Sequence, residues 1–139
     1  MIQEANGRGN ACATEFRVRY AECDGFGYFH HARYWEYFEV ARTELLRKCG
    51  FRYRDLEAQG VFFVVHKAAC KYIRPIRYDD LIRVDVWVTK VTRTRVEHGY
   101  EIVCNGEVTT TAESLLVCVG RDGKPREMPD ALWERSQPA

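Results

Sequence analysis

Asp24 is the residue of this sequence best placed to act on a substrate. It follows an extended run that ends at Tyr20, it lies in a loop with Gly25 and Gly27, and a long amphipathic helix is predicted from Ala32. The N–H groups of a first helical turn have no partner within the helix and carry a partial positive charge. They can polarise a carbonyl group while a nearby carboxylate acts on its carbon. This pairing suits acyl transfer without serine, cysteine or a metal ion.

The periodicity of the apolar residues predicts the elements that would position this loop. Alternation predicts strands, a 3.6-residue period predicts the helix, and Asn-Gly is a strong hairpin signal. The predicted elements are a strand over 15–20, helices over 32–49 and 53–59, strands over 61–65, 68–73, 81–91 and 95–104, a turn at 105–106 and a strand over 107–119. One long helix followed by antiparallel strands, without an alternating βαβ pattern, indicates an α+β fold.

The segment around Asp24 also resembles the signature of a known enzyme family. The residues that carry the likeness are Tyr20, Asp24, Gly27, His31 and Tyr34. It continues through 38–44 and 74–80 and covers roughly 14–129. In these positions the sequence is similar to hotdog-fold acyl-CoA thioesterases of the 4-hydroxybenzoyl-CoA thioesterase type, including the group found near Tol-Pal genes. The resemblance implies an antiparallel sheet wrapped around one long central helix.

The resemblance implies catalytic roles for Asp24, His31 and Tyr20. Asp24 would act either as a nucleophile, which forms a mixed anhydride with the acyl group, or as a general base on water. The backbone N–H of His31 would bind the thioester oxygen, and its imidazole would contact substrate or water. Tyr20 would orient Asp24 or line the acyl pocket. No cofactor is implied beyond coenzyme A as part of the substrate.

Each of these residues also has a plain structural interpretation. Asp before Gly is common in turns, because its side chain bonds the backbone of the same turn. His31 can start a helix without a catalytic task. Tyr20 is predicted on the same strand face as Phe16 and Val18, where it would be core.

Further residues are predicted to contact the substrate. They are Gly27, Tyr28, His30, Tyr34, Arg77 and Arg93. The aromatic residues near Asp24 would accept an aromatic or a short to medium aliphatic acyl group, although aromatics are also normal core. Arg77 and Arg93 would bind the phosphates of CoA, since guanidinium groups suit phosphate oxygens. Solvated charges on strands are the competing interpretation for both.

Two other reactive side chains favour structural roles. Cys23 is interpreted as a small packing residue, because alternation directs it away from Asp24 and no basic partner is guaranteed. Glu39 lies on the predicted helix three residues before Arg42, so an ion pair explains it better than catalysis. The adjacent His30 and His31 do not complete a ligand set with the cysteines, so no metal is expected.

Composition excludes several classes of protein. The chain has 139 residues, a net charge of +1 and 46% hydrophobic residues, which predicts one globular domain without a nucleic-acid surface. No apolar stretch approaches the ~20 residues of a membrane span. Without an evident export signal, the six cysteines are expected to be reduced and the protein cytoplasmic. Only two serines and no Gly-x-Ser-x-Gly exclude an α/β-hydrolase triad.

The predicted organisation is a flexible leader over 1–13, a hotdog thioesterase domain over 14–133 and a flexible tail over 134–139. Residues from Met128 onward are expected to be peripheral. A single curved sheet leaves edges and surfaces uncovered, so a homodimer or homotetramer is expected. Trp87 falls on the polar face of its strand and is predicted to meet a partner subunit.

Two other functions remain open at this point. One is a hotdog dehydratase that acts on hydroxyacyl thioesters with a histidine and a helix carboxylate. The other is a non-catalytic protein that binds acyl thioesters. The sequence does not identify the acyl group, and it does not decide between CoA and acyl-carrier protein as the donor.

Overall fold

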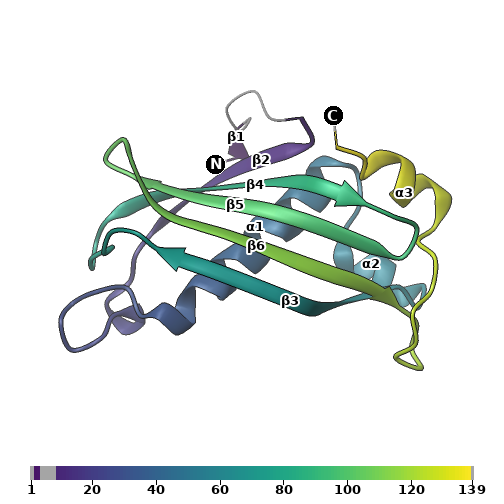
Figure 1. The fold of residues 1–139 in the computed structure, drawn as a ribbon, viewed down its shortest axis with the longest axis horizontal. Helices are drawn as coiled ribbons and strands as arrows, with labels where there is room; N and C mark the ends of the chain where they lie inside the picture. The colour runs from purple at the N-terminus through teal and green to yellow at the C-terminus, as the bar shows by residue number, and fades with distance from the viewer. Residues whose placement is uncertain (1, 4–8, 139) are drawn as a thin grey trace.

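The computed structural model describes residues 2–3 and 9–138 (Figure 1). In chain order the elements are β1 Ile2–Gln3, β2 Ala11–Arg17, the 3₁₀ turns η1 Tyr20–Glu22 and η2 His31–Arg33, α1 Tyr34–Lys48, α2 Tyr53–Ala58, β3 Phe62–Tyr72, β4 Leu81–Val91, β5 Arg95–Cys104, β6 Glu107–Val119 and α3 Asp130–Arg135. The strands form one antiparallel sheet in the order β1-β2-β4-β5-β6-β3. The predicted α+β class is therefore confirmed.

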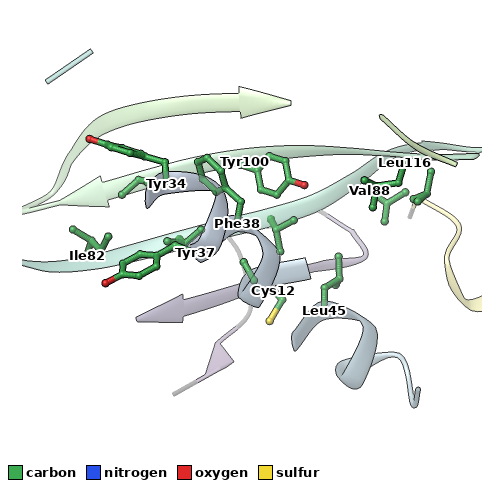
Figure 2. Close-up of a cluster of buried hydrophobic side chains, with 14 of the residues drawn as sticks. Cys12, Tyr34, Tyr37, Phe38, Leu45, Ile82, Val88, Tyr100 and Leu116 are labelled. Atoms are coloured by element: carbon green, nitrogen blue, oxygen red, sulfur yellow. The ribbon is translucent and has the colours of Figure 1, made fainter. Parts of the chain in front are cut away.

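The long helix α1 packs across one face of the sheet, against β2 and β4 (Figure 1). Its buried stripe includes Phe38, Ala41 and Leu45, which recur at the spacing of one helical face. Figure 2 shows Phe38 beside Tyr100 of the sheet, and the two rings lie 4.6 Å apart between centroids. Burial of each large side chain contributes about 1.5–3 kcal/mol, so this contact fixes the helix on the sheet.

The first strand begins earlier than predicted. β2 starts at Ala11, and Ala11, Cys12 and Ala13 are buried, so the predicted leader over 1–13 overlaps a folded strand. Small residues carry a weak strand signal, but here they pack beside Trp87. Trp87 also covers Gly99, where any side chain would collide with the indole ring. The position of Trp87 on this face of the strand is therefore explained by contacts within one chain. Residues 1 and 4–8 of the predicted leader lie outside the described residues.

The two strands predicted over 61–65 and 68–73 form one continuous strand. In β3 the register with β6 shifts between Val65 and Lys67, which makes His66 the extra residue of a bulge. β3 is the last strand of the sheet, and residues 64–69 are all exposed. This edge is open in the single chain.

The C-terminal segment is part of the core rather than peripheral. Met128 is 2% exposed and Leu132 of α3 is 1% exposed. The Asn10 side-chain amide donates a hydrogen bond of 2.9 Å to the carbonyl oxygen of Gln137, inside the predicted tail 134–139. α3 ends at Arg135, whose guanidinium lies over the Phe51 ring. The domain thus extends beyond the boundary predicted at residue 133.

Candidate active site

The loop that carries Asp24 is closed by backbone bonds at its base. Cys23 and Phe29 pair as an antiparallel bridge, and the Asp24 N–H donates to the Tyr28 carbonyl oxygen at 2.8 Å. The chain reverses at Gly27, whose φ of +80° is a conformation that other residues adopt at a cost. The conformation of the loop therefore comes from bonds within seven residues.

The Asp24 carboxylate is oriented by this loop. Its Oδ1 atom accepts hydrogen bonds from the N–H of Phe26 at 2.8 Å and of Tyr28 at 3.1 Å. Among the described residues Oδ2 has no hydrogen-bond donor, and the side chain is exposed. The turn interpretation of Asp24 is thus correct, and it leaves one carboxylate oxygen free for chemistry.

The start of the helix lies directly after this loop. The turn η2 begins at His31 and continues into α1, close to the predicted start of the helix at Ala32. His30 caps it, because its Nδ1 accepts a hydrogen bond of 3.0 Å from the Ala32 N–H. Within the described part of the chain the His31 N–H donates to no acceptor. That N–H is free to bind a ligand oxygen, and its role in an oxyanion site stays a prediction.

The His30 and His31 rings stack at 4.3 Å between centroids, so they lie side by side. His31 is exposed, whereas His30 is half-buried and its Nδ1 is used by the cap. No hydrogen bond joins His31 to Asp24 in the described residues. The structure places both next to one loop, and it assigns His30 a structural task alongside its predicted substrate contact.

The two tyrosines of the predicted site lie in different surroundings, and Tyr20 is not where the strand pattern placed it. Tyr20 begins the turn η1, since β2 already ends at Arg17; it is 79% exposed and meets Tyr78 edge-on at 5.4 Å. The predicted core position of Tyr20 is wrong. Tyr34 is 3% exposed and packs against Phe29 and Tyr72, so it belongs to the core beneath the site. Burial raises the pKa of Tyr34 to about 12.

The two arginines predicted to bind CoA lie at opposite ends of the molecule. Arg77 lies next to the Asp24 loop. Its backbone forms an antiparallel bridge with Tyr28, and its guanidinium lies over the Tyr28 ring, 4.8 Å from the centroid. Arg93 lies beyond the far end of β4, about 33 Å of strand away. There it donates to the Asp130 carboxylate at 2.7 Å and to the Met128 carbonyl oxygen at 3.1 Å. Within one chain, Arg93 binds the C-terminal segment rather than the loop.

Glu22 is a site residue that sequence reasoning missed. It is 2% exposed, and Oε1 accepts from the Arg19 N–H at 2.9 Å and from the Tyr37 hydroxyl at 2.5 Å. Burial alone would raise the pKa of Glu22, but the hydrogen bonds from Arg19 and Tyr37 lower it below its usual value. Since the Glu22 carbonyl oxygen also accepts from the His30 N–H, this residue ties the loop to the helix start. The only local signal is its position three residues after Arg19.

Cys23 has the surroundings of a packing residue. Its Sγ lies 3.6 Å from the carbonyl oxygen of Arg19. Burial and the neighbouring Asp24 carboxylate raise the pKa of Cys23, which keeps the thiol protonated. All six cysteines are free. The structure therefore favours the packing interpretation over a nucleophile.

A second polar group lies in a cavity beneath the second half of α1. Arg42 donates to the Tyr100 hydroxyl at 3.0 Å, and no carboxylate lies within 4 Å of Arg42 in the part of the chain that the structure describes. The predicted ion pair between Glu39 and Arg42 is therefore not formed. His98 is 7% exposed, and its Nδ1 is buried without a partner. Burial, with a smaller effect of Arg42, lowers the pKa of His98 to about 3, so the imidazole is neutral.

His98 could have been noticed from the sequence. It stands among the even-numbered residues of β5, which face the helix and are otherwise apolar apart from Tyr100.

Across the described residues, no three side chains of the metal-binding types gather into a possible metal site, and no helix is long and apolar enough to cross a membrane.

Known proteins share this fold and much of this sequence. The chain is 38% identical over 119 residues to the acyl-CoA thioester hydrolase YbgC of Escherichia coli O6:H1, covering 84% of this chain and 88% of that protein. It is 33% identical over 111 residues to acyl-CoA thioesterase YbgC of Haemophilus influenzae, covering 79% and 82%. The crystal structure of DHNA-CoA thioesterase from Staphylococcus aureus matches with a TM-score of 0.82 and 38% identity, covering 84% and 80%.

A sheet wrapped around one long helix, shared with these proteins, is the hotdog fold of thioesterases, so the predicted fold is confirmed. A family model described as the thioesterase-like superfamily matches residues 18–135. The chain belongs to the thioesterase-like superfamily, and the prediction of a thioester hydrolase is confirmed at this level.

Proposed function

We propose that this protein hydrolyses acyl-CoA thioesters at the Asp24 loop. The observation that carries the proposal is the geometry of Asp24: one carboxylate oxygen is fixed by two backbone N–H groups, and the other has no partner among the described residues. A fixed carboxylate with one free oxygen is suited to act on a carbonyl carbon or on a water beside it. The coenzyme A relatives support the choice of thioester.

The reaction can follow either of two routes. As a general base, Asp24 takes a proton from water while the water oxygen bonds to the thioester carbon and the C–S bond breaks. As a nucleophile, Asp24 itself bonds to that carbon, CoA thiolate leaves, and water then cleaves the mixed anhydride. Both routes give a carboxylic acid and CoA. Both need a donor for the oxyanion, and the free His31 N–H at the helix start supports that role.

The surroundings of the loop support the choice of substrate. Phe26 is 83% exposed and stacks on Tyr28, while Tyr20 and Tyr78 form a second exposed aromatic pair. Exposed aromatic side chains of this kind suit an aromatic or short to medium aliphatic acyl group. The exposed Arg77 guanidinium beside Tyr28 suits a CoA phosphate. No cofactor is needed for this reaction.

We further expect two copies of the chain to pair along β3. This edge strand exposes residues 64–69, and Val64, Val65, Tyr72 and Ile73 are each 47–54% exposed. An open apolar strand edge is a template for pairing with another strand. Light scattering coupled to size-exclusion chromatography should therefore give the mass of a dimer or tetramer. A monomer at micromolar concentration would contradict this assembly.

The test of the function is release of free thiol, followed with a disulfide reagent, from a panel of CoA esters with short, long and aromatic acyl groups. We expect thiol release from at least one class and a ranking among them. No release from any CoA ester would reject the proposal. Carrier-protein thioesters, hydration of an enoyl thioester and binding without turnover would then separate the remaining possibilities.

A further inference from the structure

His30 joins the Asp24 loop to the start of the helix through three hydrogen bonds. Its backbone N–H donates to the Glu22 carbonyl oxygen at 2.8 Å, and its carbonyl oxygen accepts from the Arg33 N–H at 2.9 Å. Its side chain makes the third bond, because Nδ1 accepts from the Ala32 N–H at 3.0 Å. The backbone is extended at His30 and becomes helical directly after it. These bonds fix the direction in which the first helical turn leaves the loop.

The same bonds fix the direction of the free His31 N–H. The His30 carbonyl and the His31 N–H belong to one planar peptide group, so a bond that holds the oxygen also orients the N–H. That oxygen is held by the Arg33 N–H, and the ring cap on Ala32 closes the same turn. Beyond the turn, the His31 carbonyl oxygen accepts from the Tyr72 hydroxyl at 3.2 Å. A donor stabilises a developing oxyanion best when it is held in place before the reaction.

The cap requires a neutral imidazole. A neutral ring has one nitrogen that donates and one that accepts, whereas a protonated ring has two donors and no acceptor. Because Nδ1 of His30 accepts from the Ala32 N–H, the ring carries its proton on Nε2. A second proton would set an Nδ1–H against the Ala32 N–H, and the hydrogen bond would be lost. Imidazole side chains commonly change their charge between about pH 5 and pH 8.

No neighbouring side chain can replace this bond. The titratable or charged side chains around the His30 ring are His31, Glu22, Cys23, Arg33 and Glu36. The His31 ring only stacks on it, and Arg33 and Glu36 pair with each other at 3.0 Å. Among the described residues, the Ala32 N–H is the one group that bonds to the His30 ring. The cap therefore depends on the protonation state of a single side chain.

We propose that His30 is a positioning residue for the hydrolysis at the Asp24 loop. Its neutral imidazole holds the first helical turn so that the His31 N–H faces the thioester oxygen, and protonation of the ring lowers the rate. The inference rests on the proposed function, because it concerns a donor of the same reaction. In this role His30 acts through the backbone of the residues that follow it, which differs from the substrate contact predicted for it.

The test is the pH dependence of thiol release from an acyl-CoA, measured in quenched samples. In the wild type, kcat should fall about tenfold between about pH 8 and pH 5.5 while KM changes less than twofold, because the donor acts mainly in the transition state. His30→Asn keeps a side-chain oxygen that can cap the turn and does not titrate. It should retain most of the activity at pH 8 and lose this dependence on pH. His30→Leu has no acceptor, so its kcat should be about tenfold lower throughout.

His31→Asn separates the two stacked histidines, since it keeps the backbone N–H and removes the other ring. Its kcat should still fall toward acid as the wild type does. A measurement without turnover is the amide resonance of Ala32 in NMR spectra, recorded over the same pH range. This resonance should move with protonation of the His30 ring in the wild type and in His31→Asn, and should stay in place in His30→Asn.

Several results would overturn the proposal while hydrolysis itself stands. They are an acid decline of kcat that is unchanged in His30→Asn, a decline that disappears in His31→Asn instead, and wild-type kcat in a folded His30→Leu at pH 8. An Ala32 resonance that ignores the His30 ring would also reject it. No thiol release from any CoA ester would reject the reaction and the positioning role together, which distinguishes that failure from the others.

Discussion

The two ends of α1 present opposite kinds of polar group. At its start, Asp24 lies exposed in a loop and is held by N–H groups of Phe26 and Tyr28. Beneath its second half, His98 and Arg42 line an apolar cavity. The other residues of the cavity wall come from strands and helices that are distant in the sequence. The Asp24 carboxylate is oriented at the surface with one oxygen free. His98 Nδ1, in contrast, has no hydrogen-bond partner, and Arg42 has no carboxylate partner among the described residues. We call the start of the helix, where we propose that the reaction takes place, the reacting end, and the second half of the helix the cavity end.

The sharpest way to break this comparison is Asp24→Asn. The amide can keep the Oδ1 turn bonds but is a poor nucleophile and base, so kcat/KM for an acyl-CoA should fall by about 10²–10⁴-fold. Asp122→Asn is the matched control, because Asp122 is an exposed turn residue whose Oδ1 accepts from the Lys124 N–H at 3.0 Å. It should keep wild-type kinetics. Equal activity in the two variants would remove Asp24 from the mechanism.

Glu22→Gln tests whether the reacting end depends on a buried carboxylate. Loss of the charge that Arg19 and Tyr37 bind should lower the free energy of unfolding by about 1–3 kcal/mol at pH 7. Since the folded pKa of Glu22 is lowered, this stability is present above the ordinary carboxyl pKa of about 4.3 and is lost as pH falls further. In urea unfolding, the difference in free energy of unfolding between the wild type and Glu22→Gln should therefore become smaller as the pH is lowered below about 4.3.

The control for Glu22 is Glu36→Gln, which removes one partner of an exposed ion pair with Arg33. It should cost no more than about 0.5 kcal/mol. If both variants were equally stable, Glu22 would not hold the loop to the helix.

Arg77 and Arg93 allow the same residue type to be compared at both ends. Arg77→Met should raise KM for acyl-CoA several-fold, because a phosphate contact is lost, with little change in stability. Arg93→Met should instead lower the free energy of unfolding by about 1–2 kcal/mol, since bonds to Asp130 and Met128 and the contact with Trp133 disappear. Steady-state kinetics and urea unfolding of both variants decide this. The reverse pattern would place the CoA phosphates at the cavity end.

The last prediction concerns the way in which the buried His98 makes the free energy of unfolding depend on pH. The unfolded chain protonates this residue near pH 6.5, whereas the folded chain resists protonation down to about pH 3. Stability should therefore fall as pH drops from 6.5 to 4.5, by at most about 1.4 kcal/mol per pH unit. His98→Phe and His98→Gln should both flatten this slope. An unchanged slope in both would mean that the imidazole is not shielded from water.

The conformation of the Asp24 loop could be predicted from the sequence better than the cavity end, for a physical reason. The hydrogen bonds that shape the Asp24 loop run between residues 23 and 29. Turn chemistry and the family motif were therefore sufficient to predict a turn at Asp24. The cavity instead joins Arg42, His98 and Leu132, which only the folded sheet brings together. The long helix was recognised from its period, but β2 was started too late because Ala11 to Ala13 are too small to give a clear strand pattern.

The structure places two residues of the predicted site differently from the prediction for the same reason. Tyr20 was assigned to a strand that ends three residues earlier, and Arg93 was assigned by charge although its partners lie in α3 and the segment before it. Both placements depend on the path of the chain after a strand ends, and the periodicity of apolar residues does not predict that path.

The most direct measurement is a crystal structure of Asp24→Asn with an uncleaved acyl-CoA. We expect the thioester carbon beside Asn at position 24 and the carbonyl oxygen about 3 Å from a His31 N–H of the same or a partner subunit. A thioester bound away from both would contradict the assignment of this loop as the reacting end.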